Sequence, residues 1–248
     1  DDTAALIGER LSVTVLPPLL IDFIYEQTHG HPFFASELVC ALREAGALRL
    51  VDGVCQLTQT PTELRLQRFP TTMDGVVRSR IDRLRPQQLL ALKVASVVGR
   101  TFVHRIVDGV HPIAADRVYL RSYLDDLEQQ ELTARHATIE PTYSFRHILI
   151  QEITYSTLSF AQRRELHLAV ASWYERRSSE ATHASYPPEE VTPLLAHHYG
   201  QAAEHPLATA VELRKAVAAL VRAGNQALRS GAAREAVGLC ERGLTLTS

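Results

Sequence analysis

Apolar residues recur every three or four positions in two stretches between Leu16 and Leu50, and this spacing predicts two amphipathic helices. The sequence Gly30-His31-Pro32 separates the stretches, because proline cannot continue a helical hydrogen-bond ladder and disfavours helix at the residue before it. We expect the second helix to stop near Gly46. The apolar positions are Leu20, Ile21, Ile24 and Tyr25 in the first stretch, and Phe33, Phe34, Leu38, Ala41 and Leu42 in the second.

Residues 48–58 predict a short β-hairpin with Asp52 and Gly53 as its two-residue turn. The segment that follows, residues 59–70, is polar and carries two prolines, and we expect it to be a linker.

Between residues 71 and 147 the pattern predicts a series of helices that ends in a second hairpin. The helices are expected at residues 72–84, 86–99, near 103–110 and at about 115–130. The hairpin is expected from residues 132–136 and 142–146, with Tyr143 and Phe145 on one face. Helices closed by a two-stranded wing follow the order of a winged-helix domain, which we expect at residues 71–147.

From Ile148 onward the pattern is entirely helical, with a polar break at residues 178–188. Three helices rich in Ala and Leu are expected at residues 194–203, 208–230 and 232–246. The small residues and glycine turn at 227–236 are typical of a helix-pair repeat. Because one such pair cannot bury its own apolar face, we expect further repeats beyond Ser248. The fold is therefore expected to be mainly α.

Composition narrows the function classes. The 248 residues carry 26 basic and 28 acidic side chains, so no basic surface runs through the whole sequence as in many nucleic-acid-binding proteins. Three cysteines are too few for a disulfide scaffold, and apolar runs such as residues 16–21 fall far short of the roughly 20 residues of a membrane helix. With no signal peptide and Met73 as the only methionine, we expect a cytoplasmic fragment of a longer protein that does not contact membranes.

The chain lacks the sequence motifs of a nucleotide-hydrolysing or acyl-transfer site. Its only lysines, Lys93 and Lys215, neither follow glycine nor precede Ser or Thr, so no phosphate-binding P-loop is present. There is no Gly-x-Gly-x-x-Gly loop and no Gly-x-Ser-x-Gly nucleophile elbow. We expect no catalytic residues in this segment, and therefore no enzyme activity by itself.

Two further classes of site are disfavoured by residue type. The helix expected at 115–130, in the position of a DNA-recognition helix, offers five carboxylates against two arginines in the stretch from Asp116 to Glu131, and phosphate would repel them. Among eleven histidines, the only tight clusters are the pair His29 and His31 and the pair His197 and His198. Neither has cysteine partners or a His-Glu-x-x-His spacing, so we expect surface or capping histidines and no metal site.

Three strings of residues resemble signal-transduction ATPases with numerous domains, the STAND class. Residues 28–34 (Thr-His-Gly-His-Pro-Phe-Phe), followed by Glu37-Leu38, resemble the Gly-x-Pro segment of the lid in that class. Residues 143–152 (Tyr-Ser-Phe-Arg-His-Ile-Leu-Ile-Gln-Glu) resemble the Phe-Arg-His-x-Leu-x-x-Glu string at the end of its winged helix, and residues 72–84 resemble the entry to it. The resemblance covers nearly the whole chain. It is closest to the ATPase regions attached to class III adenylate or guanylate cyclases and to LuxR-type regulators.

The resemblance implies a domain order and a nucleotide site. Residues 1–70 would be a helical lid subdomain with a short hairpin, residues 71–147 the winged helix, and residues 148–248 a helical linker with tetratricopeptide-like repeats. Pro32 would lie against the adenine of ATP or ADP, with Gly30 allowing close backbone approach. His147 would contact the ADP β-phosphate, although its neighbours Arg146 and Ile148 depart from the pattern of the relatives. The alternatives are that residues 30–32 form only an interhelical turn and that His147 only caps a helix.

Three functional hypotheses follow. In the first, the chain is the regulatory segment of a STAND ATPase, which shares nucleotide with a P-loop domain of the same protein and binds a protein or small-molecule effector on its repeats. Mg²⁺ would bind only in the full-length protein. In the second, the chain is an interaction scaffold without a nucleotide role. The third, a DNA-binding regulator, requires a basic surface that the sequence does not predict.

Overall fold

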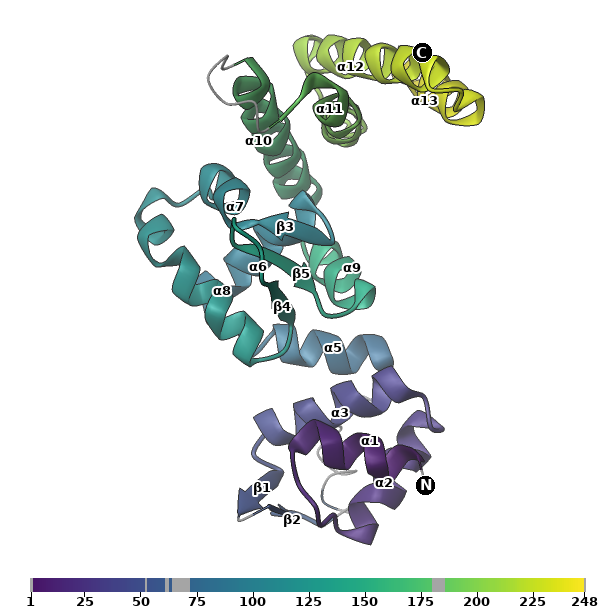
Figure 1. Ribbon diagram of the computed structural model, residues 1–248. Coiled ribbons are helices and arrows are strands. Elements are labelled where there is room, and N and C mark those ends of the chain that lie inside the picture. The colour runs from purple at the N-terminus through teal and green to yellow at the C-terminus, as the bar shows by residue number, and fades with distance from the viewer. Residues whose placement is uncertain (1, 52, 61–62, 64–71, 180–185, 248) are drawn as a thin grey trace. The chain divides into compact units, whose positions relative to one another are not determined.

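The computed structural model describes residues 2–51, 53–60, 63, 72–179 and 186–247 (Figure 1). Over these residues the protein is mainly helical and contains two small antiparallel sheets, as expected of a mainly α fold. The chain forms two compact units, residues 1–85 and 86–248. The domain boundaries expected at residues 70 and 147 stay predictions, and the first of them lies outside the described residues.

The first unit is a group of helices with a small hairpin. Its elements are α1 (Asp2–Leu11), α2 (Pro18–Thr28), α3 (Pro32–Glu44), β1 (Leu48–Val51), β2 (Val54–Leu57) and α5 (Met73–Ile81). The two helices and the hairpin predicted between residues 16 and 58 are confirmed, with Leu48 pairing Leu57 in the hairpin. Asp52 and most of the expected linker at 59–70 lie outside the described residues. Helix α1 had no counterpart in the sequence analysis.

The core of the first unit lies between α1, α2 and α3. Its largest contributors are fully buried apolar side chains, one or more from each helix: Ile7, Leu11, Leu20, Phe23, Ile24, Leu38 and Leu42. This burial removes from water most of the apolar positions that gave α2 and α3 their helical spacing, and it supplies most of the unit's stability. Tyr25 of α2 is the exception, because its side chain is 57% exposed.

A buried ion pair ties α5 to α3 within this unit. The guanidinium of Arg80 has no solvent exposure and contacts the equally buried carboxylate of Glu37 on α3. Its Nη2 also lies 2.8 Å from Oε1 of Glu44. Burial alone would lower the pKa of Arg80, but the two carboxylates outweigh it and the pKa is raised, so the residue stays charged. Arg80 shares the buried face of α5 with Val76, Val77 and Ile81, and it lies there as a charge with partners.

The second unit begins with helices that surround a three-stranded sheet. Its first elements are α6 (Pro86–Val98), β3 (Thr101–Val103), α7 (His104–Val110), the 3₁₀ helix η1 (Ala114–Tyr119), α8 (Leu120–Gln129), β4 (Thr133–His136) and β5 (Thr142–Phe145). The predicted second hairpin is confirmed as β4 and β5, but β3 joins it, giving the order β3-β5-β4. The helix expected from residue 115 is wrong in its first turns, where the chain forms η1 before α8.

Strand β3 was not predicted from the sequence, because three residues are too few to show the alternation of apolar and polar positions that indicates a strand. It is held in place by ring packing: Phe102 is stacked on Tyr143 of β5 at a centroid distance of 5.9 Å and lies 5.6 Å from Phe145. All three rings are buried, so this sheet faces the core of the unit rather than solvent.

Helices complete the second unit. They are α9 (Ile148–Ser156), α10 (Phe160–Ser179), α11 (Pro188–Ala203), α12 (Ala210–Arg229) and α13 (Ala233–Thr245). From α10 to α13 each helix packs on the next, whereas α9 packs on α6. Helix α12 begins with a capping box in which Thr209 and Glu212 satisfy each other's backbone amides. None of the helices in the described part of the chain has the length and apolar character that a membrane-spanning helix needs.

The predicted start of α11 at residue 194 is wrong, because the helix continues through Pro193 and begins at Pro188. A proline inside a helix leaves the carbonyl four residues earlier without its usual amide donor. Here that carbonyl belongs to Glu189, and it accepts a hydrogen bond of 2.6 Å from the side-chain amide of Gln226 on α12. A neighbouring helix thus supplies the hydrogen bond that the proline removes.

The buried pair gives a first prediction. Replacing Arg80 with Met leaves the carboxylate of Glu37 buried without its nearest cation, which is expected to destabilise the first unit by about 3–5 kcal/mol. The double variant Glu37→Leu/Arg80→Met removes both charges and is expected to recover most of that loss. Hydrogen exchange of the α3 and α5 amides measures the change.

Two controls accompany this measurement. Arg78→Ala breaks the exposed pair of Arg78 with Asp74 on the same helix and is expected to cost less than about 0.5 kcal/mol. The only tryptophan, Trp173, lies in the second unit, so its fluorescence should not change in any variant. A double variant no more stable than Arg80→Met would contradict the unpaired-charge explanation.

Candidate functional site

The turn between α2 and α3 is built from backbone conformations that fix its shape. His29 and Gly30 both have positive φ, +50° and +75°, and the amide of His29 donates to the carbonyl of Tyr25. His31 is extended, and its Nδ1 accepts a hydrogen bond of 3.3 Å from the amide of Phe34. Pro32 then begins α3 at the position where a missing N–H costs nothing. Pro32 is exposed, so its ring is accessible to a ligand.

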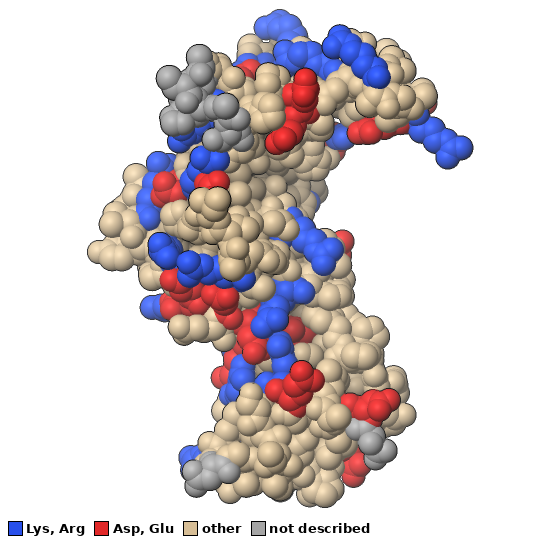
Figure 2. All heavy atoms as spheres, viewed as in Figure 1, with Lys and Arg blue, Asp and Glu red and all other residues tan. Residues whose placement is uncertain are grey.

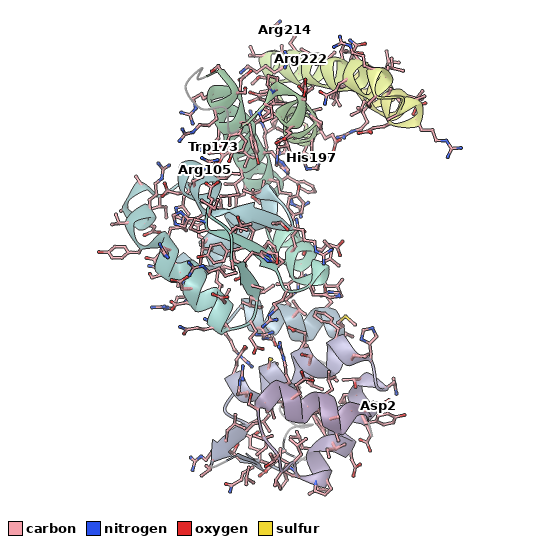
Figure 3. All side chains as sticks on the ribbon, in the orientation of Figure 1. Asp2, Arg105, Trp173, His197, Arg214 and Arg222 are labelled. Carbon is pink, nitrogen blue, oxygen red and sulfur yellow. The ribbon has the colours of Figure 1, made fainter. Side chains whose placement is uncertain are left out.

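A cavity of about 700 Å³ opens beside this turn. Its walls come from α1, from α2 and from the turn itself, and are formed by Asp2, Thr3, Ile21, Asp22, Tyr25, His29 and Gly30. Figure 3 labels Asp2 in this unit. The tyrosine ring, 57% exposed, offers a stacking surface, and the two carboxylates make the wall acidic. Such a wall accepts hydrogen bonds from amino groups and repels phosphate.

His147 connects β5 to α9 in the second unit. Its backbone is extended, and its Nδ1 accepts a hydrogen bond of 3.2 Å from the amide of Leu149, which makes it the N-cap of α9. The capping role expected as an alternative is therefore present. Gly30 and Pro32 thus lie together in the first unit, and His147 lies in the second.

Three histidines come together in the second unit, one from α10 and two from α11. The Nδ1 atoms of His167 and His198 lie 2.8 Å apart. The ring of His197, labelled in Figure 3, lies 5.8 Å from that of His167 and 4.9 Å from that of His198. One ring nitrogen of each lies within 4.8 Å of the others. We call His167, His197 and His198 the histidine cluster.

The cluster is held in its neutral form. Burial is the main cause that lowers the pKa of His167 to about 3, and the unfavourable interactions that a charged ring would have with His197 and Arg163 act in the same direction. Burial is also the main cause of the lowered pKa values of His198 and of His197. At neutral pH each imidazole therefore keeps a nitrogen lone pair. Between two neutral rings, the 2.8 Å contact is a hydrogen bond in which one Nδ1 donates and the other accepts.

A second cavity, of about 350 Å³, borders the histidine cluster. Its wall contains residues of α6, α9, α10 and α11: Ser96, Val97, Val98, Gly99, Ile148, Gln151, Glu152, Tyr155, His167, His197 and Gln201. The hydroxyl of Tyr155 lies 3.0 Å from Nε2 of His167. The cluster is therefore open to a small molecule or to water on the side of His197.

His197 and His198 are recognisable as a pair from the sequence, but His167 lies thirty positions earlier in the chain and no local spacing links it to them. A signal was present, because His167 falls between apolar residues on a helix whose neighbouring positions are buried. The prediction that the chain has no metal site was based on the histidine pairs in the sequence and did not include His167. It stays a prediction.

Comparison with known proteins adds one match. A family model described as a domain of unknown function (DUF8739) matches residues 1–56, which run from α1 into β2 and include the turn with Gly30 and Pro32. No curated protein and no solved structure matches the chain.

The positive φ of Gly30 gives a second prediction. Gly30→Ala is expected to destabilise the first unit by about 1–2 kcal/mol, because an L-residue with a side chain is strained in the left-handed region. Gly46→Ala is the matched control, with φ of +72° and open space around its Cβ position. A Cβ at residue 30 would contact only the edge of the exposed Tyr25 ring, at 3.3 Å. The two variants are therefore expected to lose similar amounts of stability, measured by thermal unfolding followed by far-UV circular dichroism. A neutral Gly30→Ala would contradict the strain argument.

Proposed function

We propose that this chain is the regulatory segment of a multidomain STAND-type signalling ATPase. In this proposal residues 1–70 are the lid, residues 71–147 the winged helix, and residues 148–248 a helical linker with the start of a tetratricopeptide-like array. The observation that carries the proposal is the order of elements: a helical subdomain with a Gly-x-Pro turn, then helices around a small sheet, then helices that pack in succession.

The topology of the middle region supports a winged helix. The order α6, β3, α7, α8, β4, β5, with β3 paired to the second strand of the hairpin, agrees with helices closed by a small wing. Helix α8, which occupies the place of a recognition helix, buries Leu120, Leu124 and Leu127 against the unit.

The same helix is poorly suited to DNA. Asp126 accepts a hydrogen bond of 2.8 Å from Gln88, and Asp125 accepts one of 3.2 Å from the hydroxyl of Tyr143. These carboxylates serve the packing of α8 on α6 and β5, and they would repel a phosphate backbone. On the face shown in Figure 2, acidic and basic side chains are intermixed. A packing and switching module is the better description of this region.

The C-terminal helices support a repeat array. Helices α12 and α13 are joined by a tight turn at Gly231, which has φ of +81°. Gly224 allows α13 to approach closely, because a Cβ there would lie 3.4 Å from Sγ of Cys240. Small residues at such a crossing are typical of helix-pair repeats, whose stacked faces bind partners. A protein or small-molecule effector would bind this array.

The turn between α2 and α3 supports contact with the base of a nucleotide. The exposed ring of Pro32 and the ring of Tyr25 in the neighbouring cavity provide surfaces on which a base can stack, and Asp22 can accept a hydrogen bond from the exocyclic amine of adenine. The acidic wall would repel phosphate, so in this proposal the P-loop domain of the full-length protein binds the phosphates and Mg²⁺. This chain thus contacts the base of ATP or ADP, and the P-loop domain contacts the phosphates.

Regulation in this proposal is a change of population. Nucleotide exchange favours one of two arrangements of lid and winged helix, and effector binding to the array favours one of the same two. The chain contributes contacts and a switchable interface, and no chemistry. The alternative, a nucleotide-independent scaffold, makes the opposite prediction about a P-loop domain: the gene would encode none before this segment.

A third prediction tests the nucleotide contacts in the full-length protein that includes the P-loop domain. Pro32→Ala is expected to weaken ADP binding about fivefold to tenfold, which corresponds to about 1 kcal/mol for one lost packing contact. The matched control is Pro86→Ala, which removes the proline that begins α6 and should leave ADP binding unchanged. Titration calorimetry gives both affinities.

His147 requires a substitution that preserves its cap. His147→Asn keeps a strong helix N-cap and removes the imidazole, so weaker ADP binding with unchanged stability would support the phosphate contact. Unchanged ADP affinity in both Pro32→Ala and His147→Asn would overturn the site assignment and favour the scaffold.

A further inference from the structure

The histidine cluster is independent of the proposed nucleotide role, since it lies between α10 and α11 and shares no residue with the turn or with His147. Three imidazoles from two helices meet there, two of them almost completely buried and the third exposed at the mouth of a cavity. We propose that His167, His197 and His198 form a binding site for one Zn²⁺ ion.

The donor set favours zinc over Mg²⁺ and Ca²⁺. Neutral imidazole nitrogens are ligands that zinc prefers, whereas Mg²⁺ and Ca²⁺ require oxygen ligands that the cluster does not supply. Three protein ligands and one open position are the arrangement of zinc sites that retain a water or an exchangeable ligand. The cavity beside His197 gives room for this fourth ligand, and Glu152 lies in its wall.

The observed distances require only small movements. Two nitrogens bound to one tetrahedral zinc at 2.0–2.1 Å lie about 3.3 Å apart, so the 2.8 Å contact between His167 and His198 opens by about half an ångström. The third nitrogen, now within 4.8 Å, moves inward. It belongs to His197, the exposed member of the histidine cluster.

Proton balance is also simple. Each neutral ring carries one proton. The ring whose Nδ1 donates in the free cluster changes tautomer, so that its proton moves to its own Nε2 and both Nδ1 atoms can bind the ion. The hydrogen bond between the two rings is replaced by two metal bonds, and no proton leaves the protein. The hydroxyl of Tyr155, 3.0 Å from Nε2 of His167, accepts that proton's hydrogen bond and fixes the ring orientation.

Charges around the cluster are balanced. Arg163, which lies over the Tyr155 ring, and Arg242 both disfavour added positive charge at the cluster, while Glu204 favours it at His197. Glu152 adds a further carboxylate on the cavity side. A bound ion would cross-link α10 to α11 and would stabilise that pair.

The test is a Zn²⁺ titration of the 248-residue chain after removal of metal with a chelator, read by competition with a chromophoric zinc indicator. One ion per chain is expected. His197→Ala, at an exposed position that the fold tolerates, should weaken binding more than about 100-fold. Tyr155→Phe should weaken it about tenfold to 100-fold through loss of the orienting hydrogen bond.

Two variants separate this site from adventitious binding. His136→Ala removes an exposed histidine on β4, and His31→Asn removes the second tight pair while keeping a good N-cap, so neither should change Zn²⁺ affinity. A second readout needs no indicator: saturating Zn²⁺ should raise the unfolding temperature reported by Trp173, which lies on α10, and should not do so in His197→Ala. Binding that survives His197→Ala, or that is lost in His31→Asn, would overturn the proposal.

Discussion

The buried pair of Glu37 and Arg80 is the constraint on which the first unit depends. A guanidinium without solvent contact is tolerated only because two carboxylates of α3 surround it, and this fixes α5 against α3 in one orientation. Glu37 lies one turn after the Gly-x-Pro turn, on the same helix that Pro32 begins. The geometry of the turn, and of any ligand it contacts, is therefore coupled to a charge pair buried behind it.

The second unit satisfies its polar groups across helices in the same manner. Gln226 of α12 provides the hydrogen bond that Pro193 removes from α11, and Arg164 of α10 holds Glu212 with contacts of 2.7 and 2.8 Å. The array is thus more than a stack of apolar faces, because each helix completes the hydrogen bonding of another. A zinc ion at the histidine cluster would add a link of the same kind between α10 and α11.

The two proposals concern different parts of the chain and are separable. The nucleotide proposal draws on the turn of the first unit and on the order of elements, while the zinc proposal draws only on contacts between α10 and α11. Both proposals rely on the same principle: a segment without catalytic groups can still respond to ligands if each ligand stabilises one packing of its helices. The family match covers residues 1–56, which include the turn and lie within the first unit.

The sequence by itself determined most helices and both hairpins, because apolar spacing and glycine or proline at the ends act locally. Tertiary structure alone decided the rest. Strand β3 is too short for a pattern and exists through Phe102 packing on β5, and α11 runs through Pro193 because Gln226 compensates. The partners of Arg80 and the third member of the histidine cluster lie thirty or more positions away in the chain, and no local pattern encodes which distant side chains will meet.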